Sequence, residues 1–354
     1  MHIFHFMTRK YFLENTTMGA FLAALPSTFA FKEDDMRKNT KLIKPQRLQK
    51  GDTIGLITPA SPASEEKIKK AIQNIENQGF KVKYTDAIRL KNGHLAGTDA
   101  QRLANLHDMF ADKEVKAIWC VRGGYGCTRI LPQIDYRLIK KNPKILIGYS
   151  DVTALLHAVQ QKTGLMCFHG PVGASTFTEY NLEHLTKTLF EPDNQHLITL
   201  SKENLEKQDA AYQPVLIKGG KVCGKLSGGN LCLLSTMAGT PYQVDFTDKI
   251  VFLEDVGEKP YRVDRMLTQL LQSSNLAKAK GIVLGIFEDC QPKDEEYSLS
   301  LIDTLKERLG NLNMPVLYGF SFGHIQNMCT LPLGIEAEFN ADAMTLQFLE
   351  NAVV

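Results

Sequence analysis

Short apolar runs alternate with segments of helical spacing in the first half of the chain, and this alternation limits the folds open to it. Apolar runs at residues 52–60, 80–84, 115–121 and 145–147 predict strands, and residues 64–77 and 98–110 predict helices. Strands that alternate with helices of this length indicate βαβ units and a parallel sheet. In such sheets the functional groups lie in loops at the carboxyl ends of the strands. Candidate site residues are therefore expected in those loops.

The length of 354 residues exceeds one typical domain and favours two. Residues 45–180 are predicted to form an N-terminal α/β domain, and residues 216–354 a C-terminal domain that mixes strands and helices. Between them, residues 181–215 become polar and lose their periodicity, which is typical of an interdomain connection. In the second half we expect strands at 249–253, 281–287 and 315–318, helices at 261–271 and 297–309, and two late strands after Pro332.

Charge and cysteine content disfavour several classes of function. A net charge of +2, with no block of Lys and Arg interleaved with aromatic residues, gives no reason to expect a nucleic-acid partner. The 7 cysteines include no CxxC pair, so neither a zinc site nor a disulfide framework is expected, and no other metal or cofactor is indicated. They are interpreted as small buried apolar residues, with a catalytic thiol at Cys127 as the alternative.

Residues 1–44 are interpreted as a leader and linker rather than as part of the fold. Arg9 and Lys10 precede an apolar run at 18–25 and a candidate cleavage site at 27–30. This order resembles a twin-arginine export signal, although Lys10 stands where the second arginine is usual. The apolar run is too short to cross a membrane, so no integral membrane segment is expected. A working leader predicts the periplasm or cell envelope, and the alternative is an N-terminal extension of a cytoplasmic protein.

Ser150 lies where the strand at 145–147 gives way, after Gly148, to a helical pattern that begins near Val152. At a sharp strand-to-helix turn a serine hydroxyl can be held above the sheet edge, beside the first unpaired amides of the helix. Ser150 is therefore a candidate nucleophile, and the backbone amide of Asp151 a candidate donor to an oxyanion. The alternative is that Ser150 simply caps the helix through the amide of Val152 or Thr153.

The strand at 115–121 ends in a glycine loop that starts at Arg122. Gly123 and Gly124 lack a Cβ, so their backbone amides can come close to a substrate oxygen. Dinucleotide binding is the alternative use of such a loop, but the full G-x-G-x-x-G spacing is missing. A nucleotide-binding oxidoreductase is therefore the least favoured class.

Glu254 and His324 each stand where an apolar run gives way to a loop that contains glycine. A serine needs a neutral imidazole to take its proton, and the imidazole needs a carboxylate to fix its tautomer. Ser150, Glu254 and His324 can supply these three groups. Alternatively, Glu254 is a solvated loop acid and His324 a loop histidine, with His94 and His169 as the rival bases.

Several short motifs follow one another along the chain: Gly-Asp-Thr-Ile-Gly (51–55), Pro-Ala-Ser (59–61), Ala-Gly-Thr-Asp (96–99), Arg-Gly-Gly-Tyr-Gly (122–126), Gly-Tyr-Ser-Asp (148–151), His-Gly-Pro (169–171), Leu-Glu-Asp-Val-Gly-Glu (253–258), Tyr-Arg-Val-Asp-Arg (261–265), Gly-His (323–324) and Leu-Pro-Leu-Gly (331–334). Together they resemble the LD-carboxypeptidase family of serine peptidases, from about residue 45 to the C-terminus. The residue after Ser150 is not glycine, which departs from the general hydrolase elbow.

The resemblance implies a flavodoxin-like N-terminal sheet domain and a smaller β-rich C-terminal domain. It implies a catalytic Ser150, Glu254 and His324 assembled between the two domains, with oxyanion donors from the amides of Asp151 and of Gly123 or Gly124. The implied reaction is hydrolysis, without a metal, of the amide bond between the L-centre of a diamino acid and the terminal D-alanine of a peptidoglycan tetrapeptide. A homodimer is also expected.

The carboxylate of such a substrate would need a cationic anchor, for which Arg122 and Lys225 are candidates, with surface salt bridges as the alternative. A related microcin-immunity branch hydrolyses aminoacyl-nucleotide-like peptides and carries an aromatic residue in a loop of its second domain. Here Trp119, the single tryptophan, lies in a strand before Arg122, which favours the cell-wall branch. A two-domain envelope protein that binds a peptide or sugar without catalysis is the alternative from another class.

Overall fold

The computed structural model of the protein describes residues 41–292 and 297–354, so the predicted leader falls almost entirely outside the described residues. The strands are β1 (Thr53–Ile57), β2 (Lys81–Lys83), β3 (Val115–Cys120), β4 (Ile145–Gly148), β5 (Phe168–His169), β6 (Leu197–Ile198), β7 (Val215–Lys218), β8 (Lys221–Asn230), β9 (Lys249–Glu254), β10 (Gly281–Ile286), β11 (Val316–Gly323), β12 (Leu331–Pro332), β13 (Glu336–Asn340) and β14 (Thr345–Phe348). The α-helices are α2 (Glu65–Glu76), α3 (Asp99–Ala111), α4 (Cys127–Ile130), α5 (Tyr136–Lys141), α6 (Val152–Thr163), α7 (Glu179–Leu185), α8 (Lys202–Leu205), α9 (Leu231–Met237), α10 (Pro260–Ser273) and α11 (Leu301–Leu309). None of the helices described here is both long and apolar enough to cross a membrane.

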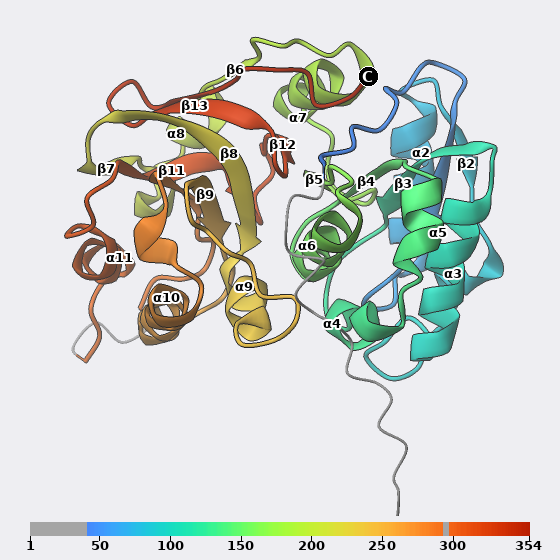
Figure 1. The fold of residues 1–354 in the computed structure, drawn as a ribbon, viewed down its shortest axis with the longest axis horizontal. Coiled ribbons are helices and arrows are strands. Elements are labelled where there is room, and N and C mark those ends of the chain that lie inside the picture. The colour runs from blue at the N-terminus through green and yellow to red at the C-terminus, as the bar shows by residue number, and fades with distance from the viewer. Residues whose placement is uncertain (1–40, 293–296) are drawn as a thin grey trace, which may run out of the picture. The chain divides into compact units, whose positions relative to one another are not determined.

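The first sheet has the strand order β12-β5-β4-β3-β1-β2 within the described chain (Figure 1). Its strands β2, β1, β3, β4 and β5 are parallel to their neighbours, and β12 pairs antiparallel with β5. The parallel part has the flavodoxin order 2-1-3-4-5, in which the first strand lies inside the sheet. The predicted flavodoxin-like N-terminal fold is confirmed.

The central strands of this sheet are buried almost along their whole length. β4 is buried along its whole length, and β3 is buried at every position except Lys116. Such continuous apolar runs are typical of parallel strands that are covered on both faces. Helices α3, α5 and α6 lie in a row (Figure 1), in which α3 and α6 contact strands of this sheet and α5 packs between these two helices.

The second sheet has the order β6-β14-β13-β8-β9-β10-β11-β7 in the described residues. Its centre, β8 to β11, is parallel, and the outer strands are antiparallel. Helices α9, α10 and α11 lie side by side next to it (Figure 1). The second half is therefore a mixed α/β unit, which agrees with the predicted fold class.

The two halves of the described chain are joined by direct hydrogen bonds. His157 of α6 contacts the carbonyl oxygen of Gly228 in β8 through Nε2 at 2.8 Å. One turn earlier on α6, the hydroxyl of Thr153 accepts a hydrogen bond from the backbone N–H of Asn230 at 3.1 Å. Asn230 is in register with Glu254 of β9. The start of α6, which follows Ser150, is thereby brought to the carboxyl ends of β8 and β9.

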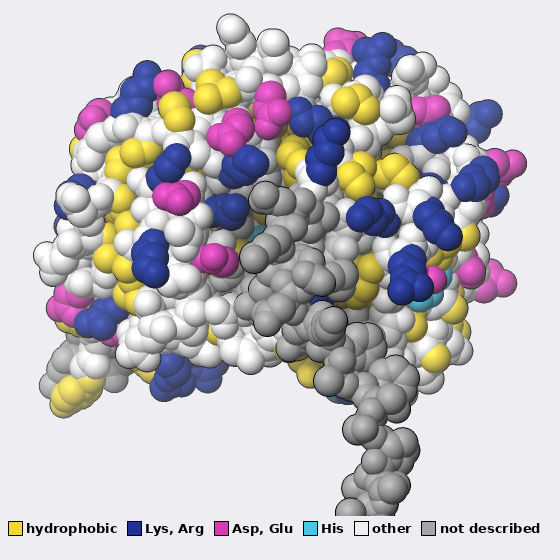
Figure 2. Space-filling view, viewed as in Figure 1, with side chains coloured by type: hydrophobic (Ala, Val, Ile, Leu, Met, Phe, Trp, Pro, Cys, Tyr) yellow, Lys and Arg dark blue, Asp and Glu magenta, His cyan; other side chains and the backbone are white. Residues whose placement is uncertain are grey.

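Charged side chains of both signs are interspersed on the face shown in Figure 2. No continuous basic stripe is visible among its described residues. This mixture of charges is consistent with the small net charge of +2.

Candidate active site

Ser150 occupies the turn between β4 and α6 with a backbone φ of +63°. Residues other than glycine adopt this left-handed conformation at an energetic cost, and the surrounding structure has to hold them there. The N-cap of α6 is Asp151, not Ser150. Among the described residues no helix amide donates to Ser150 Oγ, so the capping bond considered as the alternative is not formed.

Gly123 and Gly124 follow β3, and their lack of side chains lets the loop pass directly beside Ser150. A Cβ on Gly123 would stand 2.9 Å from the Cβ of Ser150, closer than such atoms approach. Gly124 has a φ of +118°, and a Cβ there would stand 2.4 Å from Ser61 Oγ. Because β3 and β4 are parallel neighbours, their carboxyl ends bring the glycine loop and the serine together.

Two buried charged side chains hold these loops in place. Asp151 accepts a hydrogen bond from the backbone N–H of Cys127 at 2.8 Å, which ties the serine turn to the end of the glycine loop. Arg102 donates to the carbonyl oxygens of Pro59 and Gly126. Burial raises the pKa of Asp151. The carboxylate of Asp151 thus has a structural partner, while its amide remains at the start of α6.

Glu254 and His324 form a hydrogen-bonded pair. Glu254 is the last residue of β9 and is completely buried, and His324 directly follows β11. The distance from His324 Nδ1 to Glu254 Oε2 is 2.7 Å. Gly323 has a φ of +124°, and a Cβ at this position would stand 2.7 Å from the carbonyl oxygen of Ile286. The glycine therefore lets the end of β11 pass close to β10, and it also leaves room for Glu254, whose Cβ would be 3.3 Å from the added Cβ.

The pair stabilises its charged form against the effect of burial. Burial opposes ionisation of Glu254, but the charge and hydrogen bond of His324 outweigh it and the pKa of Glu254 is lowered. Burial likewise opposes protonation of His324, and Glu254 outweighs it, so the pKa of His324 is raised. The ring of Tyr149 lies edge-on to His324, with 4.9 Å between ring centroids, and limits its movement. The imidazole is therefore held by its Nδ1 side, and Nε2 is left for a second partner.

A cavity of about 270 Å³ contains most of the predicted site residues. Its lining comprises Lys67, Arg122, Gly123, Gly124, Tyr149, Ser150, Val172, Ala174, Ser175 and His324. Glu254 lies behind His324 and does not line the cavity. The structure thus brings the serine, the glycine pair and the histidine–glutamate pair to one place.

Lys225 is not brought to this cavity. It lies in β8 with its side chain half exposed, and its Nζ is 4.0 Å from Glu336 Oε1 of the neighbouring strand. β8 pairs in register with β9, so that Asn230 rather than Lys225 lies opposite Glu254. A rise of about 3.3 Å per residue then places Lys225 roughly 16 Å from the carboxyl end of the strand. The structure therefore gives no support to Lys225 as a substrate anchor, and Lys225 has the surface position that the alternative described.

The rival candidates lie in unsuitable environments. His169 is buried, packs edge-on against Phe252 at 5.3 Å, and has its pKa lowered to about 4 by burial. His94 packs against Tyr125, with 5.3 Å between ring centroids, outside the lining of the cavity. Cys127 is completely buried, and burial raises the pKa of its thiol well above the ordinary value. A buried neutral thiol is a poor nucleophile.

Lys67 lines the cavity but was not singled out in the sequence. It lies in the first turn of α2, after Ser64, which caps the helix by accepting a hydrogen bond from the N–H of Lys67. Helix dipoles favour acidic residues in the first turn, and Glu65 and Glu66 follow that rule. Lys67 departs from that rule. A lysine in the first turn of the helix that follows the first predicted strand is therefore the sequence signal that could have indicated a functional role.

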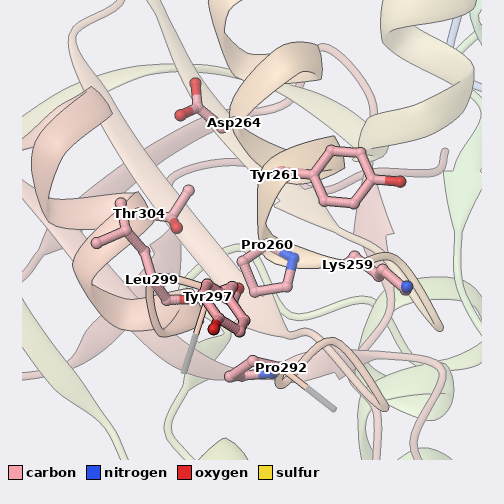
Figure 3. A pocket seen from close by; sticks show the side chains of 9 residues that line it. Lys259, Pro260, Tyr261, Asp264, Pro292, Tyr297, Leu299 and Thr304 are labelled. Atoms are coloured by element: carbon pink, nitrogen blue, oxygen red, sulfur yellow. The ribbon is translucent and has the colours of Figure 1, made fainter. Parts of the chain in front are cut away.

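A larger cavity of about 390 Å³ lies between the start of α10 and residues 297–304 (Figure 3). Its lining includes Lys259, Tyr261, Asp264 and Tyr297, and none of the predicted site residues. The described lining contains neither a histidine nor a cysteine, and its side chains do not form a nucleophile–base pair. Among the described residues, no group of three or more His, Cys, Asp and Glu side chains could hold a metal ion. The smaller cavity is therefore the candidate active site.

The sequence matches two domains of one family. Residues 54–170 match the LD-carboxypeptidase N-terminal domain, and residues 223–339 match the LD-carboxypeptidase C-terminal domain. A probable murein peptide carboxypeptidase of Bacillus subtilis is 41% identical over 307 residues, which cover 85% of this chain and 93% of the relative.

Solved structures give the same result. The muramoyltetrapeptide carboxypeptidase of Oxalobacter formigenes superimposes with a TM-score of 0.72 and 31% identity, covering 84% of this chain and 97% of that one. A microcin C7 self-immunity protein superimposes with a TM-score of 0.78 and 26% identity, covering 88% of this chain and 100% of that one. Both domains, in order and at nearly full length, have thus been matched, and the chain belongs to the LD-carboxypeptidase family.

Proposed function

We propose that this protein hydrolyses the L,D-amide bond that links the terminal D-alanine to the diamino acid of a peptidoglycan tetrapeptide. The observation that carries the proposal is the hydrogen-bonded pair of His324 and buried Glu254, which faces the same cavity as the strained Ser150. The names of the murein peptide and muramoyltetrapeptide carboxypeptidases among its relatives support the choice of substrate.

Acyl transfer to Ser150 follows from this arrangement. Ser150 Oγ attacks the amide carbonyl carbon while His324 Nε2 takes the hydroxyl proton, because Nδ1 is engaged by Glu254. The tetrahedral intermediate then expels the amine of D-alanine, which receives the proton from His324. Water attacks the acyl-enzyme in the same way, and its proton returns the serine to the hydroxyl form. Glu254 stays ionised and stabilises the imidazolium in both halves of the reaction.

Backbone amides would stabilise the oxyanion. The amide of Asp151 lies at the start of α6, where the helix has unpaired donors. The loop at Gly123 and Gly124 has no side chain between it and Ser150. Donors of this kind are fixed before the reaction starts, so they stabilise developing charge without reorganisation.

Release of D-alanine from a tetrapeptide muropeptide tests the function directly. The expected result is the loss of one alanine by mass, and the Ser150→Ala variant should lose several powers of ten in turnover. Ser175 is the other serine that lines the cavity, so Ser175→Ala is the matched variant and should retain most of the release. Normal release by Ser150→Ala would contradict the proposal.

The microcin-immunity reaction is the second candidate, and the similarity to the microcin C7 self-immunity protein supports it. An aminoacyl sulfamoyl nucleoside offered to the same preparation separates the two, because a cell-wall enzyme should cleave the tetrapeptide far faster. Single labelling of Ser150 by a serine-reactive probe argues against the binding protein without catalysis. The homodimer and the envelope location remain predictions, to be checked by sedimentation and by cell fractionation.

A further inference from the structure

We infer that Lys67 and Arg122 form a binding site for the free C-terminal carboxylate of the peptide, which makes the enzyme selective for an unblocked chain end. The inference rests on the proposed function and deepens it. It assigns a role to Lys67 and pairs it with one of the two candidate anchors, in place of Lys225.

The position of such a site is set by the length of one residue. When a single residue is released, its carboxylate carbon is three bonds from the carbonyl carbon that Ser150 attacks. The bond lengths of about 1.33, 1.46 and 1.52 Å limit the separation of these carbons to roughly 4 Å. The anion site therefore has to lie in the cavity that contains Ser150. Lys67 and Arg122 line that cavity, and they are its cations other than His324.

The charge of the lining favours an anion. Lys67 and Arg122 stand in it together with apolar, glycine and hydroxyl-bearing residues, and the described lining contains no Asp or Glu. Neither cation forms a salt bridge with any carboxylate of the described chain. Glu254 does not reduce this positive character, because it is fully buried and paired with His324. Two cations without a carboxylate partner in one small cavity create a field that attracts a negative substrate group.

The guanidinium of Arg122 is held in place beside the proposed oxyanion donors. Its Nη1 donates to the carbonyl oxygen of Pro62 at 3.0 Å, which fixes the head group. Its Nη2 lies over Gly124, 3.4 Å from where a Cβ would stand. Lys67 differs, because only its backbone is held, by Ser64, and its exposed side chain can move toward a bound carboxylate. The fixed, planar guanidinium of Arg122 and the mobile ammonium of Lys67 together can bind both oxygens of a carboxylate.

A comparison of two substrates tests the inference. One is the tetrapeptide with a free terminal carboxylate, and the other is the same peptide with a terminal amide. We expect the wild-type enzyme to prefer the acid strongly in kcat/KM. Lys67→Met, which keeps the length and removes the charge, should reduce this preference by about tenfold through a higher KM for the acid alone. Arg122→Lys keeps the charge but loses the planar group that can donate two parallel hydrogen bonds. It should reduce the preference for the acid less than Lys67→Met does.

Lys69→Met is the matched control, because Lys69 is exposed on the same helix and does not line the cavity. It changes the net charge equally and should leave the preference unchanged. An undiminished preference for the acid in Lys67→Met and in Arg122→Ala would overturn the inference.

Equilibrium binding of both peptides to Ser150→Ala separates this inference from the proposed function. If the wild-type enzyme releases neither product, the proposed function fails, and the acid should still bind more tightly than the amide. Adding Lys67→Met to Ser150→Ala should then remove about tenfold of that difference. Equal binding of acid and amide to Ser150→Ala would contradict the carboxylate site whatever the turnover.

Discussion

Ser150 shows how a single residue can be both costly to the fold and useful to the site. Its φ of +63° is unfavourable for a serine, and the neighbouring loops keep it there through close backbone contact. The sequence indicated the turn, because an apolar strand, a glycine and a helical pattern follow one another around it. It did not indicate which of two residues caps the helix, since Ser150 and Asp151 are both good capping types.

Gly123→Ala should damage activity far more than stability. The added Cβ would stand 2.9 Å from the Cβ of Ser150, so the loop or the serine has to move. We expect kcat to fall by about 10²-fold, because a displacement of about 1 Å at a reacting group has an effect of that size. Gly93→Ala is the control for activity, because a Cβ at Gly93 meets nothing within 4 Å, although its φ of +60° should make that variant somewhat less stable. Steady-state kinetics and urea denaturation check both variants, and a fully active Gly123→Ala would show that the close approach is dispensable.

Glu254→Gln should lower turnover and move the pH profile. Glu254 raises the pKa of His324, and the base has to be neutral, so wild-type activity should be lost as the pH falls through a value above 6.5. Without the carboxylate, burial of His324 is no longer opposed, and this acid limb should move to lower pH. We expect kcat to fall by about 10³- to 10⁴-fold, because the imidazolium loses its partner.

Glu258→Gln is the matched control for that profile. Glu258 lies in the same loop and pairs with Arg262 rather than with His324. Removing its charge should leave the acid limb nearly unmoved. An acid limb that stays in place in Glu254→Gln would mean that the pair does not set the pKa of the base.

At the scale of elements, the connection between the two halves supports the loop that carries His324. Asn204 donates to the carbonyl oxygen of Asn327 at 2.9 Å, and Asn181 Oδ1 accepts from the backbone N–H of Met328 at 3.3 Å. Both asparagines are buried. The polar residues that made this segment resemble a loose linker are therefore the groups that fix the loop.

Asn204→Ala should lower kcat with little change in KM. The carbonyl oxygen of Asn327 would lose a buried donor, at a cost of about 1–3 kcal/mol, and the loop that carries His324 would become less well positioned. Substrate binding should be nearly unaffected, because Asn204 does not line the cavity. Asn194→Ala is the control, since Asn194 is an exposed asparagine of the same connection. Equal losses in kcat from both variants would argue against a specific role of Asn204.

Local sequence patterns predict some of these elements and miss others. The strands β1, β3, β4, β9 and β10 were predicted within a few residues, because each is a buried apolar run between turn signals. β6 and β12 were not predicted, since each has two residues and exists only through pairing with a distant strand. The serine, acid and base could be proposed from loop positions. The position of Lys67 in the cavity lining, and of Lys225 outside it, depends on strand register and helix placement. A hydrophobic periodicity carries no information about either.

At the scale of the whole molecule, distant parts of the described chain hold one another. β12, from the C-terminal half, completes the edge of the first sheet beside β5. At the two ends, the backbone N–H of Val354 donates to the carbonyl oxygen of Pro45 at 3.0 Å. The described residues accordingly form one compact unit. Stability is therefore expected to be a property of this unit as a whole, and buried groups in either half should affect one unfolding transition.

Buried histidines predict that this transition is sensitive to acid. Burial lowers the pKa of four of them, to about 4 for His157, His169 and His196 and to about 3 for His184. The unfolded chain binds protons at these positions below about pH 6.5 while the folded chain does not, so stability should fall as the pH drops from about 6.5 to about 4. Asp255 opposes this, because its pKa is raised to about 7 and the folded state keeps its proton.

For these five groups alone, the net uptake on unfolding is up to three protons, four from the histidines less one from Asp255, or about 4 kcal/mol per pH unit. A protein with a typical stability of about 5–15 kcal/mol should unfold within a few pH units below neutrality. Urea denaturation at pH 7, 6 and 5 measures the slope. His184 Nδ1 and His196 Nε2 form a hydrogen bond of 2.8 Å, so the double variant His184→Gln, His196→Gln should be less stable at pH 7. Its unfolding free energy should also depend less steeply on pH, because up to two fewer protons are taken up on unfolding. An unchanged slope in that variant would show that other groups govern the acid response.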